Sequence, residues 1–351
     1  MKKNSIRYFF SFIAFFLFLA AFLVWFFDPF YQYHAPFLGL KLVLYERETQ
    51  MAGSIRNLSY DSCLVGSSVV ENCDTDYLDT VLGIKTLKIV KGSGSAPDLM
   101  YYLNMAQQEK ELSYVFYGLD LFSLMDTTEV TVVSEYSPKY LFTDTILDDF
   151  TYLFNKDILF KKIPLNILYS LQGKYCDGKA YNWAEGKTFS AKQAMKAYAG
   201  PGEMQEPVDF SEDKPVILEN IRSIEEMVKA HPGTKYIFFL PPYSLLNWDE
   251  IVRAGEKDKY LFALEQVFAA LLPYENVEIY SFQMDRDIIC DLNFYMDKVH
   301  FSTQINQYML QCMLEKSIEY RVTRENTDVF LQLFSETCDY IVKEGIYQYY
   351  D

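Results

Sequence analysis

The sequence predicts a three-layer α/β fold, in which a parallel sheet of about five strands is flanked by helices. Five short runs are almost continuously apolar, as is typical of strands covered on both faces. Helical patterns lie between these runs, and strands that alternate with helices favour a parallel sheet. A twenty-residue apolar run at the amino terminus adds a transmembrane helix to this prediction.

The amino-terminal apolar run, Tyr8–Phe27, would form a helix about 30 Å long, which matches the hydrocarbon core of a bilayer. Three basic residues precede it: Lys2, Lys3 and Arg7. We therefore expect residues 1–7 in the cytoplasm, a membrane anchor at 8–27 and the remainder outside the cell. A cleaved signal peptide is the alternative, but bulky apolar residues stand where a small-residue cleavage site would be expected.

The predicted sheet is built from five strands, whose ranges are Cys63–Gly66, Thr86–Lys91, Ser113–Leu119, Lys235–Leu240 and Val277–Phe282. The helical patterns between them are Pro97–Lys110, the repeat of Ile217, Ile221, Ile224 and Val228, and Lys257–Leu272. Parallel strands present their carboxyl ends at one edge of the sheet, where ligands bind in such folds. The segments that follow the strands are therefore the candidate site.

The domain organisation follows from where this alternation starts and stops. We expect a juxtamembrane segment at 28–55 and an extracellular domain at 56–351. Residues from about 125 to 212 interrupt the alternation, and 139–160 has a helical pattern, so this stretch is predicted to be a helical insertion beside or over the sheet edge. The tail, about 302–349, is predicted to be mainly helical.

Charge and motif content exclude several functions. The net charge of −16 argues against a nucleic-acid partner, because phosphate binding needs a basic face. The sequence has no Gly-rich phosphate loop, and no cofactor is expected. With three histidines and no CxxC pair, a metal site is not expected either. The six cysteines (63, 73, 176, 290, 312 and 338) are irregularly spaced, which favours buried free thiols over disulfides.

The turn after the first predicted strand reads Gly66-Ser67-Ser68. A strand that ends at glycine and leads into a helix is a common place for a nucleophile or an anion site. We predict Ser68 as the nucleophile, because the residue that heads the helix projects above the sheet edge. Ser67 is expected to stabilise the turn through local hydrogen bonds.

A nucleophilic serine needs a base, and the base needs an orienting partner. His34 lies just past the anchor and His231 at a helix end, which leaves His300, three residues after Asp297. Each feature alone is ordinary: the serines could simply cap a helix, and Asp297 and His300 could lie in an unremarkable loop. Their chain order and their places at strand ends together favour a Ser68-Asp297-His300 triad.

These motifs resemble the SGNH (GDSL-type) hydrolase superfamily, in which a Gly-Asp-Ser-like turn bears the nucleophile and Asp-x-x-His completes the triad. The chain resembles more closely the membrane-anchored, extracellular members found in Gram-positive bacteria. The matching segments span nearly the whole chain; they are Asp28-Pro29-Phe30, Gly66–Asn72, Pro241–Ser244 and Asp297–Ser302. The resemblance implies a flavodoxin-like sheet order.

The resemblance also implies the groups that would bind the oxyanion or the substrate. The second block supplies an oxyanion glycine, for which Gly94 is preferred over Gly92, and Asn72 and Tyr243 are further candidates. In the third block the superfamily usually has Asn, whereas this chain has Asp120. A carboxylate cannot donate to an oxyanion unless it is protonated, so we predict that Asp120 faces elsewhere.

The function implied is that of a serine-dependent acyl ester hydrolase or O-acyltransferase acting on cell-envelope glycan or teichoic acid. Similar proteins often work beside a multi-pass membrane acyltransferase, which is the protein partner expected here. Water and a sugar hydroxyl are equally good acceptors on sequence grounds, so hydrolysis and transfer both stay open. The non-enzymatic alternative is a silent SGNH-like scaffold that binds envelope polymer or the acyltransferase.

Overall fold

The computed structural model describes residues 2–134, 137–143 and 145–350. The chain forms two compact units. Residues 1–59 and 131–181 make up the first, here called the anchor unit, and residues 60–130 and 182–351 make up the second, the sheet unit.

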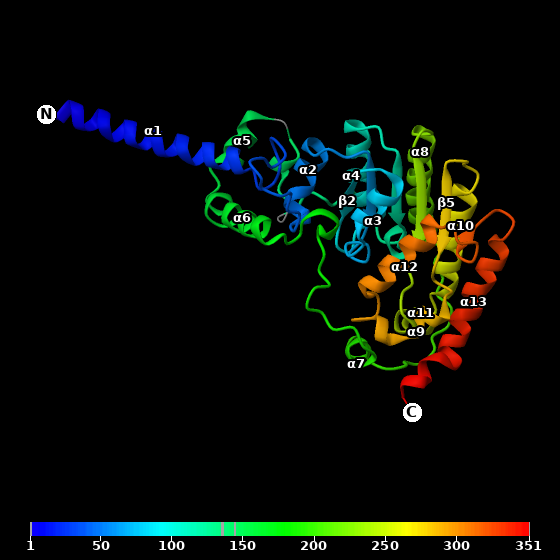
Figure 1. Cartoon of the computed structure of the whole chain (residues 1–351). Coiled ribbons are helices and arrows are strands. Elements are labelled where there is room, and N and C mark those ends of the chain that lie inside the picture. Colours follow the sequence, from blue (N-terminus) through cyan, green and yellow to red (C-terminus); the bar gives the residue numbers. More distant parts are fainter. Residues whose placement is uncertain (1, 135–136, 144, 351) are drawn as a thin grey trace. The chain divides into compact units, whose positions relative to one another are not determined.

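The anchor unit is helical and contains the amino-terminal helix α1 (Lys2–Phe27). The stretch Ser5–Phe27 is long and apolar enough to cross a membrane. The other helices of this unit are α2 (Arg47–Asn57), α5 (Ile146–Leu153), a π-helical turn (Ile158–Lys162) and α6 (Ile163–Gln172). Figure 1 shows α5 and α6 beside the carboxyl end of α1.

The chain turns sharply at the end of α1 because the buried Asp28 organises the next six residues. Its carboxylate accepts the backbone N–H groups of Gln32, Tyr33 and His34 and the hydroxyl of Tyr152. An apolar core forms beneath this turn from Val24, Phe30, Leu141, Tyr152, Ile158 and Ile163.

The sheet unit contains a six-stranded sheet in the order β2-β1-β3-β4-β5-β6. Its strands are β1 (Ser62–Gly66), β2 (Thr86–Val90), β3 (Tyr114–Gly118), β4 (Lys235–Leu240), β5 (Val277–Ser281) and β6 (Arg321–Val322). The first five are parallel and coincide with the predicted runs, whereas β6 pairs antiparallel with β5. The tail is mainly helical, as predicted, and also contains β6, which was not predicted because a two-residue edge strand leaves no periodic signal in the sequence.

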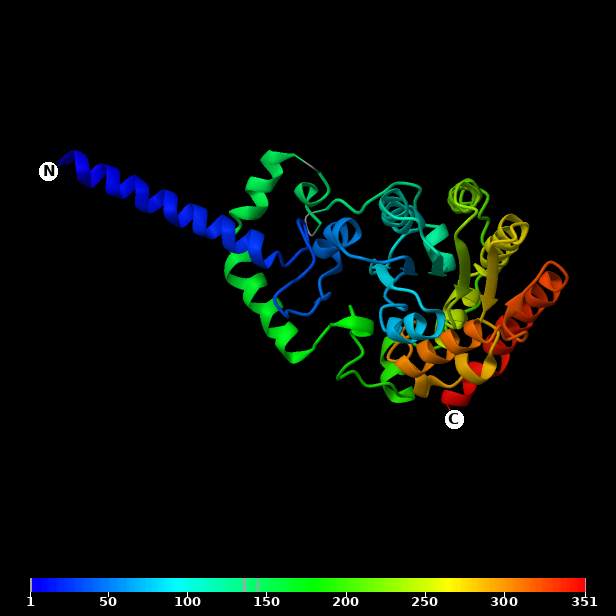
Figure 2. The same cartoon turned by 45° about the horizontal axis from the view of Figure 1, so that its top comes forward.

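Helices cover both faces of this sheet, as a three-layer α/β fold requires. On one face lie α4 (Ala96–Glu109), α8 (Lys214–Ala230) and α10 (Lys257–Leu271), and on the other lie α3 (Thr75–Leu82) and α12 (Thr303–Leu314) (Figure 2). The strand order explains this division, because right-handed crossovers change face where the order reverses after β2. The carboxyl ends of β1, β2, β3 and β4 therefore meet at one edge.

The remaining elements of the sheet unit are short, apart from α13 (Thr327–Lys343), which packs against α9 (Leu245–Arg253) and α10. The others are α7 (Ala191–Ala194), α11 (Arg286–Ile289) and 3-10 turns at Leu121–Leu124, Met195–Ala197, Leu292–Phe294 and Gly345–Tyr349. In the anchor unit, 3-10 turns lie at Lys139–Leu141 and Asp177–Lys179.

The structure divides the stretch for which one insertion at 125–212 was expected. Residues 131–181 share a unit with the amino-terminal segment, and 182–212 belong to the sheet unit. The reason is apolar packing, because Tyr152, Ile158 and Ile163 are buried in one core with Val24 and Phe30. The six cysteines are free thiols, five of them buried, which confirms the expectation drawn from their spacing.

Candidate active site

The three residues predicted as a triad form one hydrogen-bonded row in the sheet unit. Ser68 Oγ lies 2.8 Å from His300 Nε2. The other ring nitrogen, Nδ1, lies 2.8 Å from Asp297 Oδ2. Ser68 is partly exposed, whereas its neighbour Ser67 is buried. The serine that meets the imidazole is thus Ser68, as the sequence predicted.

A tight hairpin presents His300 to Ser68. Tyr295 and Phe301 form an antiparallel bridge at its base, and Asp297 Oδ1 accepts the N–H groups of His300 (2.8 Å) and Val299 (2.9 Å). Burial alone would raise the pKa of Asp297, but these N–H groups and the His300 ring outweigh it and hold the pKa below its usual value. The carboxylate is therefore ionised at neutral pH, as orienting an imidazole requires.

Hydrogen bonds to the loop after β4 hold this hairpin in place. Ser244 donates its N–H (3.1 Å) and its hydroxyl (2.7 Å) to the carbonyl of Lys298. The hydroxyl of Tyr295 donates to the carbonyl of Pro242 at 2.8 Å. The Pro-Pro-Tyr-Ser segment singled out in the sequence thus positions the hairpin that carries His300.

Ser68 is presented by a turn, which corrects the expected strand-to-helix connection. Residues 67–73 form consecutive turns, and the next helix, α3, begins only at Thr75. The turn packs very closely on the sheet: a Cβ at Gly118 would lie 2.5 Å from Val70 Cγ1, and one at Gly66 would lie 2.9 Å from Val70 Cγ2. Ser68 therefore does not head α3; its position comes from packing of the turn against two glycines.

The rest of the turn is held in place by hydrogen bonds from two buried side chains that the sequence analysis missed. Lys88, on β2, donates to the carbonyl of Glu71 at 2.9 Å. Asn306, on α12, donates to the carbonyl of Val69 at 2.8 Å and to Cys73 Sγ at 3.2 Å. The role of Lys88 could have been predicted from the sequence, because it is a lysine inside an apolar strand and a buried charge needs a specific partner.

Trp183 is a further site residue that the sequence analysis did not find. Its indole N–H donates to the carbonyl of Ser68 at 2.9 Å, and its ring stands edge-on to His300 with centroids 5.1 Å apart. Asn72 holds this tryptophan, because its side-chain oxygen accepts the N–H groups of Trp183 (3.0 Å) and Ala184 (3.1 Å). Trp183 therefore contacts both the backbone of Ser68 and the ring of His300.

The residues expected to bind the oxyanion or the substrate are placed differently. Asn72 is buried and supports Trp183. Tyr243 is also buried, and its hydroxyl donates to a carboxyl oxygen of Asp120. The Gly94 N–H donates to the carbonyl of Lys91 at 3.0 Å, closing a turn in which Ser93 has a φ of 49°. The Tyr243 hydroxyl, the Gly94 N–H and the side-chain oxygen of Asn72 are thus engaged within the protein. The Asn72 Nδ2 group, which is buried, and the Ser68 N–H donate to no acceptor in the described part of the chain.

Asp120 is a buried carboxyl that connects three strand ends. It follows β3, receives the hydroxyl of Tyr243 from the loop after β4, and is approached by Ser67 from the loop after β1. Burial raises its pKa to about 6, against lowering contributions from Ser67, Tyr243 and the charge of His300. Its side chain is 1% exposed, so it lies out of reach of a substrate.

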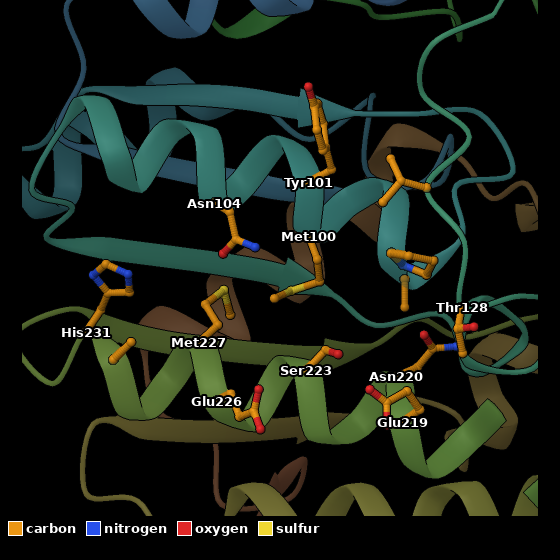
Figure 3. Close-up of a pocket in the computed structure, with 14 residues that line it drawn as sticks. Met100, Tyr101, Asn104, Thr128, Glu219, Asn220, Ser223, Glu226, Met227 and His231 are labelled. Carbon is orange, nitrogen blue, oxygen red and sulfur yellow. The ribbon is translucent and has the colours of Figure 1, made fainter. Parts of the chain in front are cut away.

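The other two histidines lie elsewhere. His34, in the anchor unit, bonds the carbonyl of Trp25 at 2.8 Å. His231 ends α8 and lines a groove of about 760 Å³ between α4 and α8, whose walls Figure 3 shows. Neither Ser68 nor Asp297 lines that groove, so its chemistry is separate from that of the row.

Comparison with known proteins adds little to this geometry. No protein-family model matches the sequence, and no curated protein matches it. Among solved structures, a Streptococcus pneumoniae protein provisionally named a platelet activating factor is 12% identical, with a TM-score of 0.41. The match covers 76% of this chain and 91% of that one. A likeness of this size carries no conclusion about function, and the SGNH resemblance stays a prediction.

Replacing Asp120 by Asn should stabilise the protein in a pH-dependent way. A carboxyl whose pKa rises from 3.8 to about 6 on folding contributes stability that is complete below pH 3.8 and is lost as the pH rises through about 6. Asp120→Asn avoids that loss and keeps an acceptor for Tyr243. The free energy of unfolding of the variant relative to that of the wild type should therefore rise between pH 4 and pH 7, by at most roughly 3 kcal/mol. Its melting temperature relative to the wild type should rise over the same range.

The matched control is Asp126→Asn, which removes an exposed carboxylate from the same loop. Thermal unfolding of both variants between pH 4 and pH 7 checks the expectation. A difference from the wild type that is the same at every pH would show that Asp120 does not ionise in this window.

Proposed function

We propose that this chain is a serine-dependent enzyme of the SGNH (GDSL) type, which hydrolyses acyl esters or transfers their acyl group to another hydroxyl. The observation that supports this proposal most is the row from Ser68 Oγ through His300 to Asp297, with 2.8 Å at each step. A partly exposed serine, a base within hydrogen-bond reach and an ionised orienting carboxylate are what acyl transfer by a serine requires.

The proposed reaction has two steps. Ser68 Oγ attacks the ester carbonyl while His300 Nε2 takes its proton, and Asp297 stabilises the imidazolium that forms. The tetrahedral intermediate then expels the alcohol, which receives the proton from His300, and the acyl group stays on Ser68. Water or a second hydroxyl, deprotonated by His300, attacks this acyl-enzyme and releases Ser68 with its proton.

The oxyanion of the proposed intermediate has few hydrogen-bond donors. The Ser68 N–H is available to it, whereas the Gly94 N–H is engaged with Lys91 and Asp120 is buried. Losing one donor costs on the order of a hundredfold in rate. The proposed enzyme is therefore expected to turn over slowly unless the substrate opens the turn at 91–94.

The same observation favours a second candidate function. A scaffold of this fold that binds envelope polymer or a multi-pass membrane acyltransferase would need no oxyanion donors. In such a scaffold the hydrogen bonds among Ser68, His300 and Asp297 would only stabilise the fold. A test of serine reactivity separates the two functions.

We further propose that the substrate is a glycan or teichoic acid of the cell envelope and that the sheet unit is extracellular. The apolar helix α1 and the basic residues that precede its apolar stretch support the location. The resemblance to membrane-anchored SGNH-like proteins of Gram-positive bacteria supports the polymer class.

Replacing Ser68 by Ala should abolish labelling by a fluorophosphonate probe, which reacts with activated serines. Ser113→Ala is the matched control, because it removes an exposed serine that directly precedes β3, at the opposite end of the strands from Ser68. In-gel fluorescence should show the wild type and Ser113→Ala labelled and Ser68→Ala unlabelled. An unlabelled but folded wild type would instead favour the scaffold.

Replacing Trp183 by Phe should slow probe labelling roughly two- to tenfold, the size of one lost neutral hydrogen bond. The variant keeps an aromatic ring near His300 but loses the N–H that holds the carbonyl of Ser68. Trp25→Phe makes the same chemical change in the anchor unit and should leave the labelling rate unchanged. Equal rates in all three proteins would show that Trp183 does not position the nucleophile.

Protease added to intact spheroplasts should digest the sheet unit, because the basic residues before the apolar stretch of α1 keep the amino end inside. Immunoblotting against the carboxyl terminus checks this, with a cytoplasmic protein as the control for lysis. Full protection of the carboxyl terminus in spheroplasts, with digestion after lysis, would refute both the extracellular location and the envelope substrate.

A further inference from the structure

The helices of the anchor unit carry large apolar side chains on their outer surface as well as in their core. Leu147 and Phe150 on α5 are 78% and 55% exposed, and Leu171 on α6 is 78% exposed. Six such residues, here called the apolar foot, lie on α5, α6 and the segment between them: Leu147, Phe150, Phe154, Phe160, Leu168 and Leu171.

The spacing of these residues shows that each helix is apolar on two sides. Leu147, Phe150 and Phe154 recur at i, i+3 and i+7 along one face, and the rings of Phe150 and Phe154 stack 5.9 Å apart. On the inner side, Tyr152 and Ile163 are buried in the core of the unit. A helix face in contact with water normally carries charged or polar residues, and a cluster of exposed large apolar residues marks a contact with lipid or protein.

The length of α1 indicates which of these contacts the apolar foot makes. Tyr8–Phe27 is a run of twenty residues, about 30 Å long, which just spans the hydrocarbon core of a bilayer. From Val24 onward, however, α1 packs into the core of the anchor unit, where Val24 is fully buried. The free part, Tyr8–Leu23, is only about 24 Å long, which leaves a shortfall of about 6 Å.

The shortfall disappears if the last turn of α1 sits at the depth of the hydrocarbon boundary. Trp25, which is 45% exposed at this level, fits that position, because tryptophan is enriched at membrane interfaces. The side chains that pack on Val24 come from α5 and from the segment that leads into α6, so these helices must then lie at the same level. Figure 1 shows both of them beside this end of α1.

We propose that the apolar foot is immersed in the leaflet at the carboxyl end of α1, so that its partner is the lipid bilayer itself. Interfacial helices bury their apolar face about 5–10 Å below the headgroups, which covers the shortfall in α1. The chain is then held by a spanning helix and by a second, lateral contact. Two contacts of this kind fix the orientation of the anchor unit about the axis of α1.

The test uses the full-length protein in phosphatidylcholine–phosphatidylglycerol liposomes, with an environment-sensitive NBD fluorophore on Leu168→Cys. Five native cysteines are buried, and Cys290→Ser removes the sixth from the background. The control is Ile318→Cys, which replaces an aliphatic side chain in the sheet unit that is 89% exposed. Circular dichroism checks that both proteins are folded.

Emission from the label at position 168 should shift to the blue and be quenched by doxyl-labelled lipids several-fold more than emission from position 318. Leu171→Cys, on the same face of α6, should behave like Leu168→Cys. Equal quenching at positions 168 and 318 would overturn the proposal. A blue shift at position 168 without lipid quenching would also overturn it, because the apolar foot would then be covered by protein.

Discussion

The hydrogen bond between His300 Nδ1 and Asp297 Oδ2 is the interaction on which the candidate site depends. It fixes the imidazole so that Nε2 faces Ser68, and Asp297 can make it because its other oxygen already holds the backbone of the hairpin. The hairpin in turn rests on Ser244, which accounts for a polar Pro-Pro-Tyr-Ser segment directly after a buried strand. One carboxylate thus links the fold of a loop to the alignment of the His300 ring.

A second buried carboxyl, Asp120, connects the strand ends beneath the row. Its contacts with Tyr243 and Ser67 join the loops after β4 and β1 to β3. Burying a carboxyl is costly, and burial raises the pKa of Asp120 to about 6. An acid at this position would interfere with an oxyanion if it faced the substrate, but Asp120 points into the protein, where one of its oxygens accepts the hydroxyl of Tyr243.

The sequence was informative where a signal is local or periodic. Buried parallel strands leave short apolar runs, so all five were located to within about a residue. The short motifs Gly66-Ser67-Ser68 and Asp297-x-x-His300 likewise identified the three residues that the structure brings together. Long-range contacts left no such signal. Trp183 reaches Ser68 from 115 residues away, Val24 finds its core in residues 141–163, and β6 is too short to show a period. The turn at 67–73 was misjudged because Gly-Ser-Ser suits a helix start and a packed turn equally well.

The central claim is that Ser68 becomes acylated because His300 and Asp297 activate it. The most direct measurement is rapid quenching of the full-length protein with 4-nitrophenyl acetate, followed by peptide mass spectrometry. The account predicts one acetyl group on the peptide that carries Ser68, absent from His300→Ala and much reduced in Asp297→Asn. An acetyl group located on Ser67, or equal acetylation of Ser68 in all three folded proteins, would contradict it.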